Sequence, residues 1–233
     1  MNPSDRIILA LDVADANAAL AWVRRLRAHV GMVKVGLELF TAAGPGLVRE
    51  LRREGLGVFL DLKLHDIPNT VAATVRAAAR CDVQMLTVHA SGGAAMLAAA
   101  AAAAPPSLRL LGVTVLTSLD EAALAELDFP GTAADRVLRW ARLCRRQGLG
   151  GVVCSAQEAA AVRAACGAAL TLVVPGIRPA GAAKGDQARV ATPETAIRTG
   201  ADYLVLGRAV TGADDPESAL AAVATEIEQA LAG

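Results

Sequence analysis

Apolar runs typical of buried strands alternate with helical patterns about eight times along the 233 residues of the chain. Runs such as 32–36 and 57–63 are hydrophobic almost throughout, which predicts strands of a parallel sheet that is buried on both faces. A helix-length segment follows each run, as the crossover connections of parallel strands require. Eight such units predict an α/β fold of the closed (βα)8 type, a TIM barrel, rather than an open sheet.

The predicted elements follow from these patterns and from helix-end signals such as the capping residue Asp15 and the terminal Gly55. We predict strands over 6–12, 32–36, 57–63, 84–89, 109–116, 150–155, 170–175 and 203–207. We predict helices over 15–28, 43–54, 69–80, 93–104, 133–147, 156–166, 193–199 and 216–231. No linker composition separates these units, so residues 1–233 are expected to form a single barrel domain.

Composition excludes several classes of partner. The chain has 23 Lys and Arg against 23 Asp and Glu, so no basic excess indicates nucleic-acid binding. Its four cysteines lack metal-binding spacing, which indicates buried, reduced thiols in a cytoplasmic protein. The longest near-apolar run, 94–106, is too short to span a membrane, and the first residues do not resemble a signal peptide. We therefore expect a cytoplasmic protein without a membrane or nucleic-acid partner.

Polar side chains fall at or near the carboxyl ends of the predicted strands. They are Asp12, Lys34, Asp61, Lys63, His89, Thr117 and Arg208. In a closed barrel these ends converge on one face, where side chains from different strands can meet around a single ligand. This distribution predicts an active site at that face.

The densest group of charges lies in and just after the third predicted strand. The two-residue period of a strand places Asp61 and Lys63 on the same face, and Asp66 follows where the chain turns. An Asp-x-Lys pair at a strand end is often only a solvated salt bridge, but the apolar neighbours here favour a functional cluster. With Asp12 and Lys34 these residues predict an array of alternating charge that keeps a lysine protonated, and therefore able to act as an acid.

A second predicted feature is a phosphate site. The segment 175–179 follows the seventh strand, and Gly207 and Arg208 follow the eighth, which is where phosphate sites recur in this fold. A Gly-Arg pair elsewhere is usually only a turn with a surface arginine, but here the guanidinium can bind phosphate oxygens in a bidentate manner. The irregular segment 181–187 is predicted to be a lid over the ligand.

The histidines and the acidic residues give no convincing metal signature. We interpret His65 as support for its loop and His89 as a structural residue. Asp61 and Asp66 suggest a magnesium site, but the neighbouring lysines already supply positive charge there. We therefore predict no metal and no cofactor.

The ten residues 61–70, Asp-Leu-Lys-Leu-His-Asp-Ile-Pro-Asn-Thr, resemble the signature of the orotidine 5′-phosphate decarboxylase family in its bacterial branch. Further ordered matches lie at 10–12, 34–36, 113–118, 151–155, 175–179, 185–187 and 207–208, so the resemblance covers essentially the whole chain. It implies a phosphate-binding TIM barrel that converts orotidine 5′-phosphate to UMP in de novo pyrimidine biosynthesis without metal or cofactor.

The resemblance also implies residue roles. Lys63 is expected to donate a proton to C6 of the pyrimidine, with Asp61 beside the substrate carboxylate. A homodimer with shared active sites is implied, in which Asp66 and Thr70 reach the neighbouring subunit's site and complete the charge network there. The other implied contacts are Asp12 and Lys34 with the ribose, Thr117 with the base, Gln187 with base and phosphate, and Arg178, Gly207 and Arg208 with the phosphate.

Two other functions compete with this one. A magnesium-dependent phosphosugar decarboxylase or aldolase of the same superfamily has a similar Asp-x-Lys-x-x-Asp motif, but carries an acidic residue near the position of Lys34. A noncatalytic nucleotide-binding barrel would bind UMP without turnover, although it has no need of Lys63 between two carboxylates.

Overall fold

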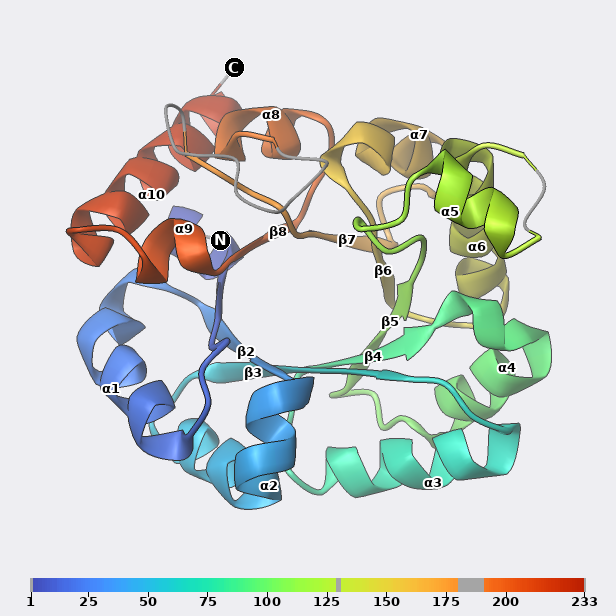
Figure 1. Cartoon of the computed structure of the whole chain (residues 1–233), viewed down its shortest axis with the longest axis horizontal. Helices are drawn as coiled ribbons and strands as arrows, with labels where there is room; N and C mark the ends of the chain where they lie inside the picture. The colour runs from blue at the N-terminus through green and yellow to red at the C-terminus, as the bar shows by residue number, and fades with distance from the viewer. Residues whose placement is uncertain (1, 129–130, 180–190, 233) are drawn as a thin grey trace.

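The computed structural model describes residues 2–128, 131–179 and 191–232, and within them eight parallel strands close into a barrel in chain order (Figure 1). The strands are β1 (Ile7–Ala10), β2 (Met32–Gly36), β3 (Gly57–Leu64), β4 (Met85–His89), β5 (Arg109–Val113), β6 (Gly151–Val153), β7 (Thr171–Val174) and β8 (Tyr203–Leu206). The predicted TIM barrel is confirmed, and each predicted strand is present, in several cases with shorter bounds.

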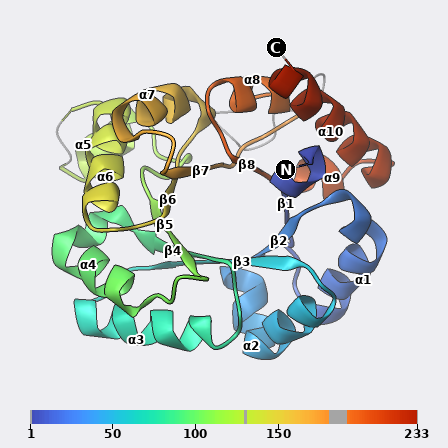
Figure 2. The same ribbon diagram turned by 180° about the vertical axis from the view of Figure 1, so that it is seen from behind.

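Helices surround the barrel, as the view from behind shows (Figure 2). They are α1 (Ala16–Leu26), α2 (Leu37–Arg53), α3 (Pro68–Ala79), α4 (Gly93–Ala103), α5 (Glu121–Glu126), α6 (Ala133–Arg146), α7 (Ala156–Cys166), α8 (Pro193–Arg198), α9 (Arg208–Thr211) and α10 (Pro216–Ala232), with short 3-10 turns at Pro3–Arg6, Arg27–His29 and Ala90–Gly92. Within the described residues, no helix is long and apolar enough to cross a membrane.

The helix ends follow the capping signals of the sequence, with three exceptions. Asp15 caps α1 by accepting a hydrogen bond from the Ala18 N–H at 2.9 Å, as predicted. The sequence pattern missed α5 and α9, which have six and four residues, too few to show a helical period. The six-residue α8 was predicted from its start signal, Thr192-Pro193-Glu194, and not from a period. The pattern also placed the start of α2 six residues too late, because this helix is kinked at Gly44, where φ is 64° and a proline follows.

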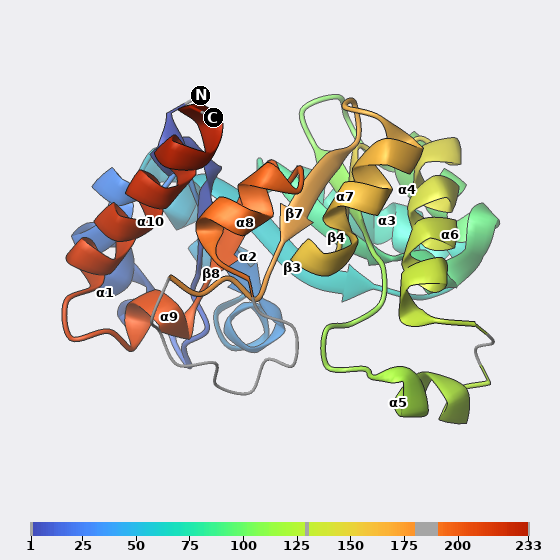
Figure 3. The same ribbon diagram turned by 90° about the horizontal axis from the view of Figure 1, so that it is seen from above.

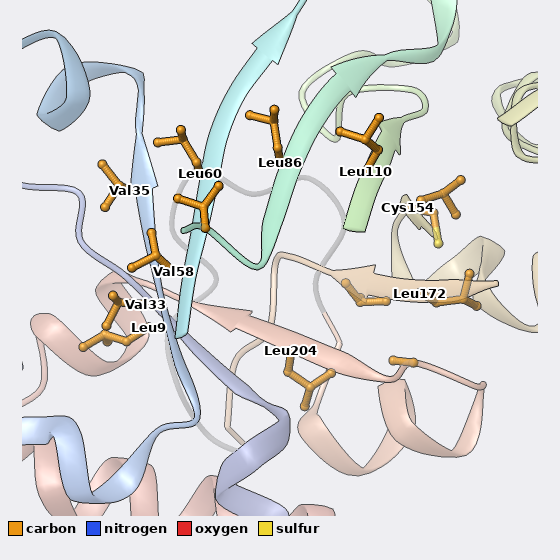
Figure 4. Packing of buried hydrophobic residues seen from close by; sticks show 14 of the residues in the cluster. Leu9, Val33, Val35, Val58, Leu60, Leu86, Leu110, Cys154, Leu172 and Leu204 are labelled. Carbon is orange, nitrogen blue, oxygen red and sulfur yellow. The ribbon is translucent and has the colours of Figure 1, made fainter. Parts of the chain in front are cut away.

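Two apolar layers make up the core, because successive residues of each strand point to opposite sides of the sheet. Leu9, Val33, Leu60, Leu86 and Leu204 belong to the outer layer, between the sheet and the helices (Figure 4). The inside of the barrel is filled by Ile8, Ala10, Met32, Phe59, Met85, Leu111, Val173 and Val205. The barrel therefore has a packed interior. Asp12, Lys34 and Asp61 each come two residues after a member of this inner set, toward the carboxyl ends of the strands.

The cysteines belong to this core. All four are free and buried, as predicted. Burial raises the pKa of Cys144 and of Cys154 to about 12, so both thiols stay protonated at neutral pH.

The carboxyl ends of the strands lie together at one end of the barrel. Figure 3 shows α5 and α9, which follow β5 and β8, at the end opposite to the chain termini. The connections at this end also include the β3–α3 turn and the segment after β7. This is the end at which the sequence predicts the active site.

We expect Gly151→Ala to lower the free energy of unfolding by about 1–3 kcal/mol, because added methyl groups strain a packed core. Gly151 pairs with both β5 and β7, and a Cβ atom there would lie 2.6 Å from a Leu111 methyl carbon and 2.6 Å from the Thr171 carbonyl oxygen. The Thr171 oxygen belongs to the backbone, so it cannot move aside by a rotamer change. Urea unfolding followed by circular dichroism measures the loss.

Gly46→Ala is the matched control, since a Cβ atom there meets nothing within 4 Å and the residue lies in α2. Alanine is a better helix former than glycine, so this variant should be at least as stable as the unsubstituted chain. Equal stabilities of the two variants would contradict the packing assigned to β6.

Candidate active site

A cluster of four charged side chains lies at the carboxyl ends of β1, β2 and β3. The Lys63 Nζ lies 2.8 Å from Asp61 Oδ2, and the Lys34 Nζ lies 3.7 Å from the same oxygen. Lys34 also donates a hydrogen bond to Asp12 Oδ1 at 3.0 Å. Four members of the charge array predicted from the sequence are thus in contact, in the predicted order along the barrel.

The cluster is partly removed from water. The side chains of Asp61 and Lys34 are each 12% exposed and that of Lys63 is 32% exposed. Burial by itself raises the pKa of Asp61, but the charges of Lys34 and Lys63, with hydrogen bonds from Lys63 and Thr87, outweigh it and hold the pKa below its usual value. Asp61 is therefore a carboxylate at neutral pH, held between two cations.

Strand β3 is irregular where it carries these charges. Leu60 pairs with Leu86 of β4, but the next pair is Leu64 with Val88, so three residues of β3 lie opposite Thr87 alone. Lys63 has φ of 50°, a left-handed conformation that is uncommon for a residue with a side chain. The predicted placement of Asp61 and Lys63 on one face holds, although a bulge and not a regular strand brings them together.

Thr87 was not identified from the sequence. Its side chain is fully buried, its hydroxyl oxygen accepts a hydrogen bond from the Lys63 N–H at 2.8 Å, and the hydroxyl donates to Asp61 Oδ1 at 2.9 Å. The only sequence signal is a polar residue inside an apolar strand, and threonine is common in strands. The hydrogen bonds of Thr87 to Lys63 and Asp61 depend on the bulge in β3, which the sequence does not reveal.

An apolar cavity of about 160 Å³ opens beside the cluster. Lys34, Asp61 and Lys63 are among its lining residues, and the others are Phe59, Val113, Val115, Leu116, Thr117, Val153, Cys154, Pro175 and Val205. Thr117, predicted to contact a ligand, therefore faces the same space as the charges. A second depression, on the side of Asp12 and Glu38, shares the three charged residues.

Two glycines leave room next to the charges. A Cβ atom on Gly36 would lie 3.1 Å from the Lys34 Nζ, and one on Gly207 would lie 3.4 Å from Asp12 Oδ2. The end of β8 thus lies next to the end of β1, and Arg208 begins α9 at this point. Gly207 and Arg208 are therefore close to the charged cluster, as the convergence of strand ends predicts.

The segment after β7 is described in part. Arg178 donates from its backbone N–H to the Ala191 carbonyl at 3.0 Å and from its Nη1 to the Ile177 carbonyl at 3.1 Å. The predicted lid, 181–187, and with it Gln187, lies outside the described residues.

Asp66 and Thr70 lie apart from the cluster within this chain. Both are exposed, and neither is among the described residues that line the two cavities. The Asp66 Oδ1 accepts a hydrogen bond from the Ile67 N–H at 2.6 Å. Ile67, which lies between Asp66 and Thr70 in the sequence, is 67% exposed. Among the described residues, no ion pair links Asp66 to the cluster, so its place in the array, which was predicted from charge, stays a prediction.

Two of the three histidines, His65 and His89, lie near each other. The ring centroids of His65 and His89 are 5.4 Å apart. Burial, then the nearby His65 and Lys63, lower the pKa of His89, so it is neutral at neutral pH. Among the described residues, no group of three or more His, Cys, Asp or Glu side chains is arranged to hold a metal ion.

Comparison with known proteins gives one consistent family. The model of the orotidine 5′-phosphate decarboxylase / HUMPS family matches residues 5–223. An orotidine 5′-phosphate decarboxylase of Anaeromyxobacter sp. (strain K) is 56% identical over 224 residues, covering 96% of this chain and 99% of the relative. That of Moorella thermoacetica is 52% identical over 237 residues, covering 98% and 94%.

A solved structure agrees with these sequence matches. The crystal structure of orotidine 5′-phosphate decarboxylase from Lactobacillus acidophilus superposes with a TM-score of 0.84 at 36% identity, covering 95% of this chain and 98% of that one. The barrel, the matched residues and the relatives agree over nearly the full length, and the chain belongs to the orotidine 5′-phosphate decarboxylase / HUMPS family.

Proposed function

We propose that this protein converts orotidine 5′-phosphate to UMP and carbon dioxide without a metal ion or cofactor. The observation that carries the proposal is the Lys34–Asp61–Lys63 cluster, with ammonium–carboxylate distances of 3.7 and 2.8 Å beside an apolar cavity. Its family relatives are named for this reaction. As a step of de novo pyrimidine biosynthesis, it would take place in the cytoplasm, where free cysteines such as these persist.

The cluster suits the chemistry of this decarboxylation. Breaking the bond between C6 and the carboxylate leaves an electron pair on C6, where the ring offers no adjacent group to accept it. In the proposed reaction the Lys63 ammonium stabilises this developing charge and then transfers its proton to C6, so that carbon dioxide leaves and UMP forms. Asp61 lies beside the substrate carboxylate and keeps Lys63 charged until the bond breaks.

The remaining site residues bind the substrate in this proposal. Asp12 and Lys34 contact the ribose hydroxyls, and Thr117, which lines the same cavity as the charges, contacts the pyrimidine. The phosphate is bound by Arg178, Gly207 and Arg208, with Gln187 bridging it to the base. Enzymes reduce barriers by about 8–23 kcal/mol, and one lysine cannot supply the upper part of that range, so binding of the remote phosphate must help to organise the charges.

The charge pattern distinguishes this function from a magnesium-dependent reaction on a phosphosugar. A magnesium ion needs several oxygen ligands. Here the Asp61 carboxylate already has two ammonium neighbours, and Lys34 lies between Asp12 and Asp61. A divalent ion at this carboxylate would be repelled by both lysines.

We further propose a homodimer in which each subunit completes the other's site. Asp66 and Thr70 are exposed near an exposed Ile67, and neither is among the described residues that line the two cavities of their own chain. A two-fold axis near the β3–α3 turn would bring these residues to the partner's cluster, because the same surface is used twice in such an interface. Asp66 of the partner subunit would then give the partly exposed Lys63 a second carboxylate.

Lys63→Ala should lower kcat for orotidine 5′-phosphate by at least about 10³-fold, because it removes both the general acid and the cation beside C6. UMP should still bind, since ribose and phosphate contacts remain. An absorbance assay and calorimetric UMP titration measure the two quantities. Arg27→Ala, a 57% exposed residue paired with Glu54, controls for loss of a cation elsewhere. Near-normal turnover by the Lys63 variant would refute the assignment.

Arg208→Ala should weaken kcat/KM far more for orotidine 5′-phosphate than for orotidine, because only the nucleotide carries the phosphate that this guanidinium binds. We expect a loss of about 10²-fold or more on the nucleotide, as for a charge-assisted contact. Arg198→Ala on α8, where the arginine is 47% exposed and pairs with Glu194, is the control. Equal losses on both substrates would show that Arg208 does not bind phosphate.

Mixing two inactive variants tests the shared site. Lys63→Ala and Asp66→Ala homodimers each lack one group in every site, but a mixed dimer has one site with both groups and one with neither. After subunit exchange of equal amounts, about a quarter of the sites should be complete, and activity should reappear. If Asp66 serves the site of its own chain, no mixed dimer has a complete site and activity stays absent.

A further inference from the structure

The strongest unassigned feature of the site is the hydroxyl group of Thr87. Thr87 lies on β4 two residues after Met85, so it points to the same, inner side of the barrel, and it is fully buried. A hydroxyl has one proton to donate and lone pairs with which to accept. The proton goes to Asp61 Oδ1 at 2.9 Å, and a lone pair accepts the Lys63 N–H at 2.8 Å.

The hydrogen bond from Thr87 to Asp61 leaves the two oxygens of this carboxylate with different partners. Oδ1 accepts from Thr87, while Oδ2 faces the ammonium groups of Lys63 at 2.8 Å and Lys34 at 3.7 Å. A carboxylate held at one oxygen cannot rotate about its last side-chain bond. The bond from Thr87 therefore fixes the direction in which Asp61 presents its charge to both lysines.

The second hydrogen bond acts on the backbone of the proposed acid. Lys63 has φ of 50°, which costs free energy and persists only where surrounding contacts enforce it. Three residues of β3 lie opposite Thr87, so regular ladder hydrogen bonds are interrupted here. The Thr87 hydroxyl takes the place of a ladder partner for the Lys63 N–H.

We propose that Thr87 is a positioning residue for the decarboxylation, whose hydroxyl orients Asp61 and holds the Lys63 backbone so that the Lys63 ammonium faces the substrate. The proposal rests on the proposed function and deepens it. Thr87 lines neither cavity among the described residues, so it acts through its two neighbours and not on the substrate.

The test compares Thr87→Val, which keeps the shape and removes the hydroxyl, with Thr87→Ser, which keeps the hydroxyl. Thr114→Val is the control, because Thr114 is also buried and its hydroxyl donates to the Val153 carbonyl at 2.7 Å, away from the charges. We expect Thr87→Val to lower kcat by about tenfold to a hundredfold, the usual effect of a small misplacement, with a much smaller change in KM. Thr87→Ser and Thr114→Val should keep kcat near that of the unsubstituted protein.

Two kinetic results would overturn the proposal: equal kcat values for Thr87→Val and Thr114→Val, or a loss in Thr87→Ser as large as in Thr87→Val. If Thr87→Val does not fold, Thr87→Ala against Thr87→Ser replaces it, because these two side chains differ by the hydroxyl alone.

Crystal structures of Thr87→Val and Thr114→Val give a readout that does not depend on turnover. The 2.8 Å contact between Lys63 Nζ and Asp61 Oδ2 should be lost in the former and kept in the latter. If the unsubstituted protein does not consume orotidine 5′-phosphate, the proposed function fails, and this distance alone decides whether Thr87 positions the pair. An unchanged contact in Thr87→Val refutes the positioning role.

Discussion

The structure of the site depends on one buried carboxylate with two cations. Burying the charge of Asp61 at the mouth of an apolar barrel costs free energy, and the ammonium groups of Lys34 and Lys63 at 3.7 and 2.8 Å offset that cost. Each of these three charges would be unfavourable at the mouth of the barrel without the other two. Because they come from β2 and β3, the closed barrel is what brings the compensating charges together, and Asp12 on the β1 side balances Lys34 in turn.

This arrangement links fold to chemistry. A lysine that stays charged inside a low-polarity cavity is already in place before charge develops on a substrate, so little rearrangement accompanies the reaction. The irregularity of β3 also helps to place the charged lysine before the reaction begins. A regular strand would pair each residue with β4, whereas the bulge opposite Thr87 turns the Lys63 backbone into a left-handed conformation and leaves its side chain beside Asp61.

Most of the fold and much of the site can be predicted from the sequence. The alternation of apolar runs with helices predicts the barrel, and strand-end polar residues predict that Asp12, Lys34, Asp61 and Lys63 meet. Strand periodicity assumes regular pairing, so it cannot predict the bulge or the hydrogen bonds of Thr87, which depend on register between two strands. Charge alone also groups Asp66 with the others, but a pattern of charges carries no information about the direction of the following turn and so cannot predict which cluster Asp66 joins.

In the proposed reaction this charge cluster performs a decarboxylation without a metal ion. The most direct measurement is the loss of orotidine 5′-phosphate absorbance with protein that has been treated with EDTA and assayed in its presence. We expect turnover at the same rate as in untreated protein, with UMP as the product. Activity that disappears in EDTA and returns with Mg²⁺, or no consumption of orotidine 5′-phosphate under either condition, would contradict the proposed reaction.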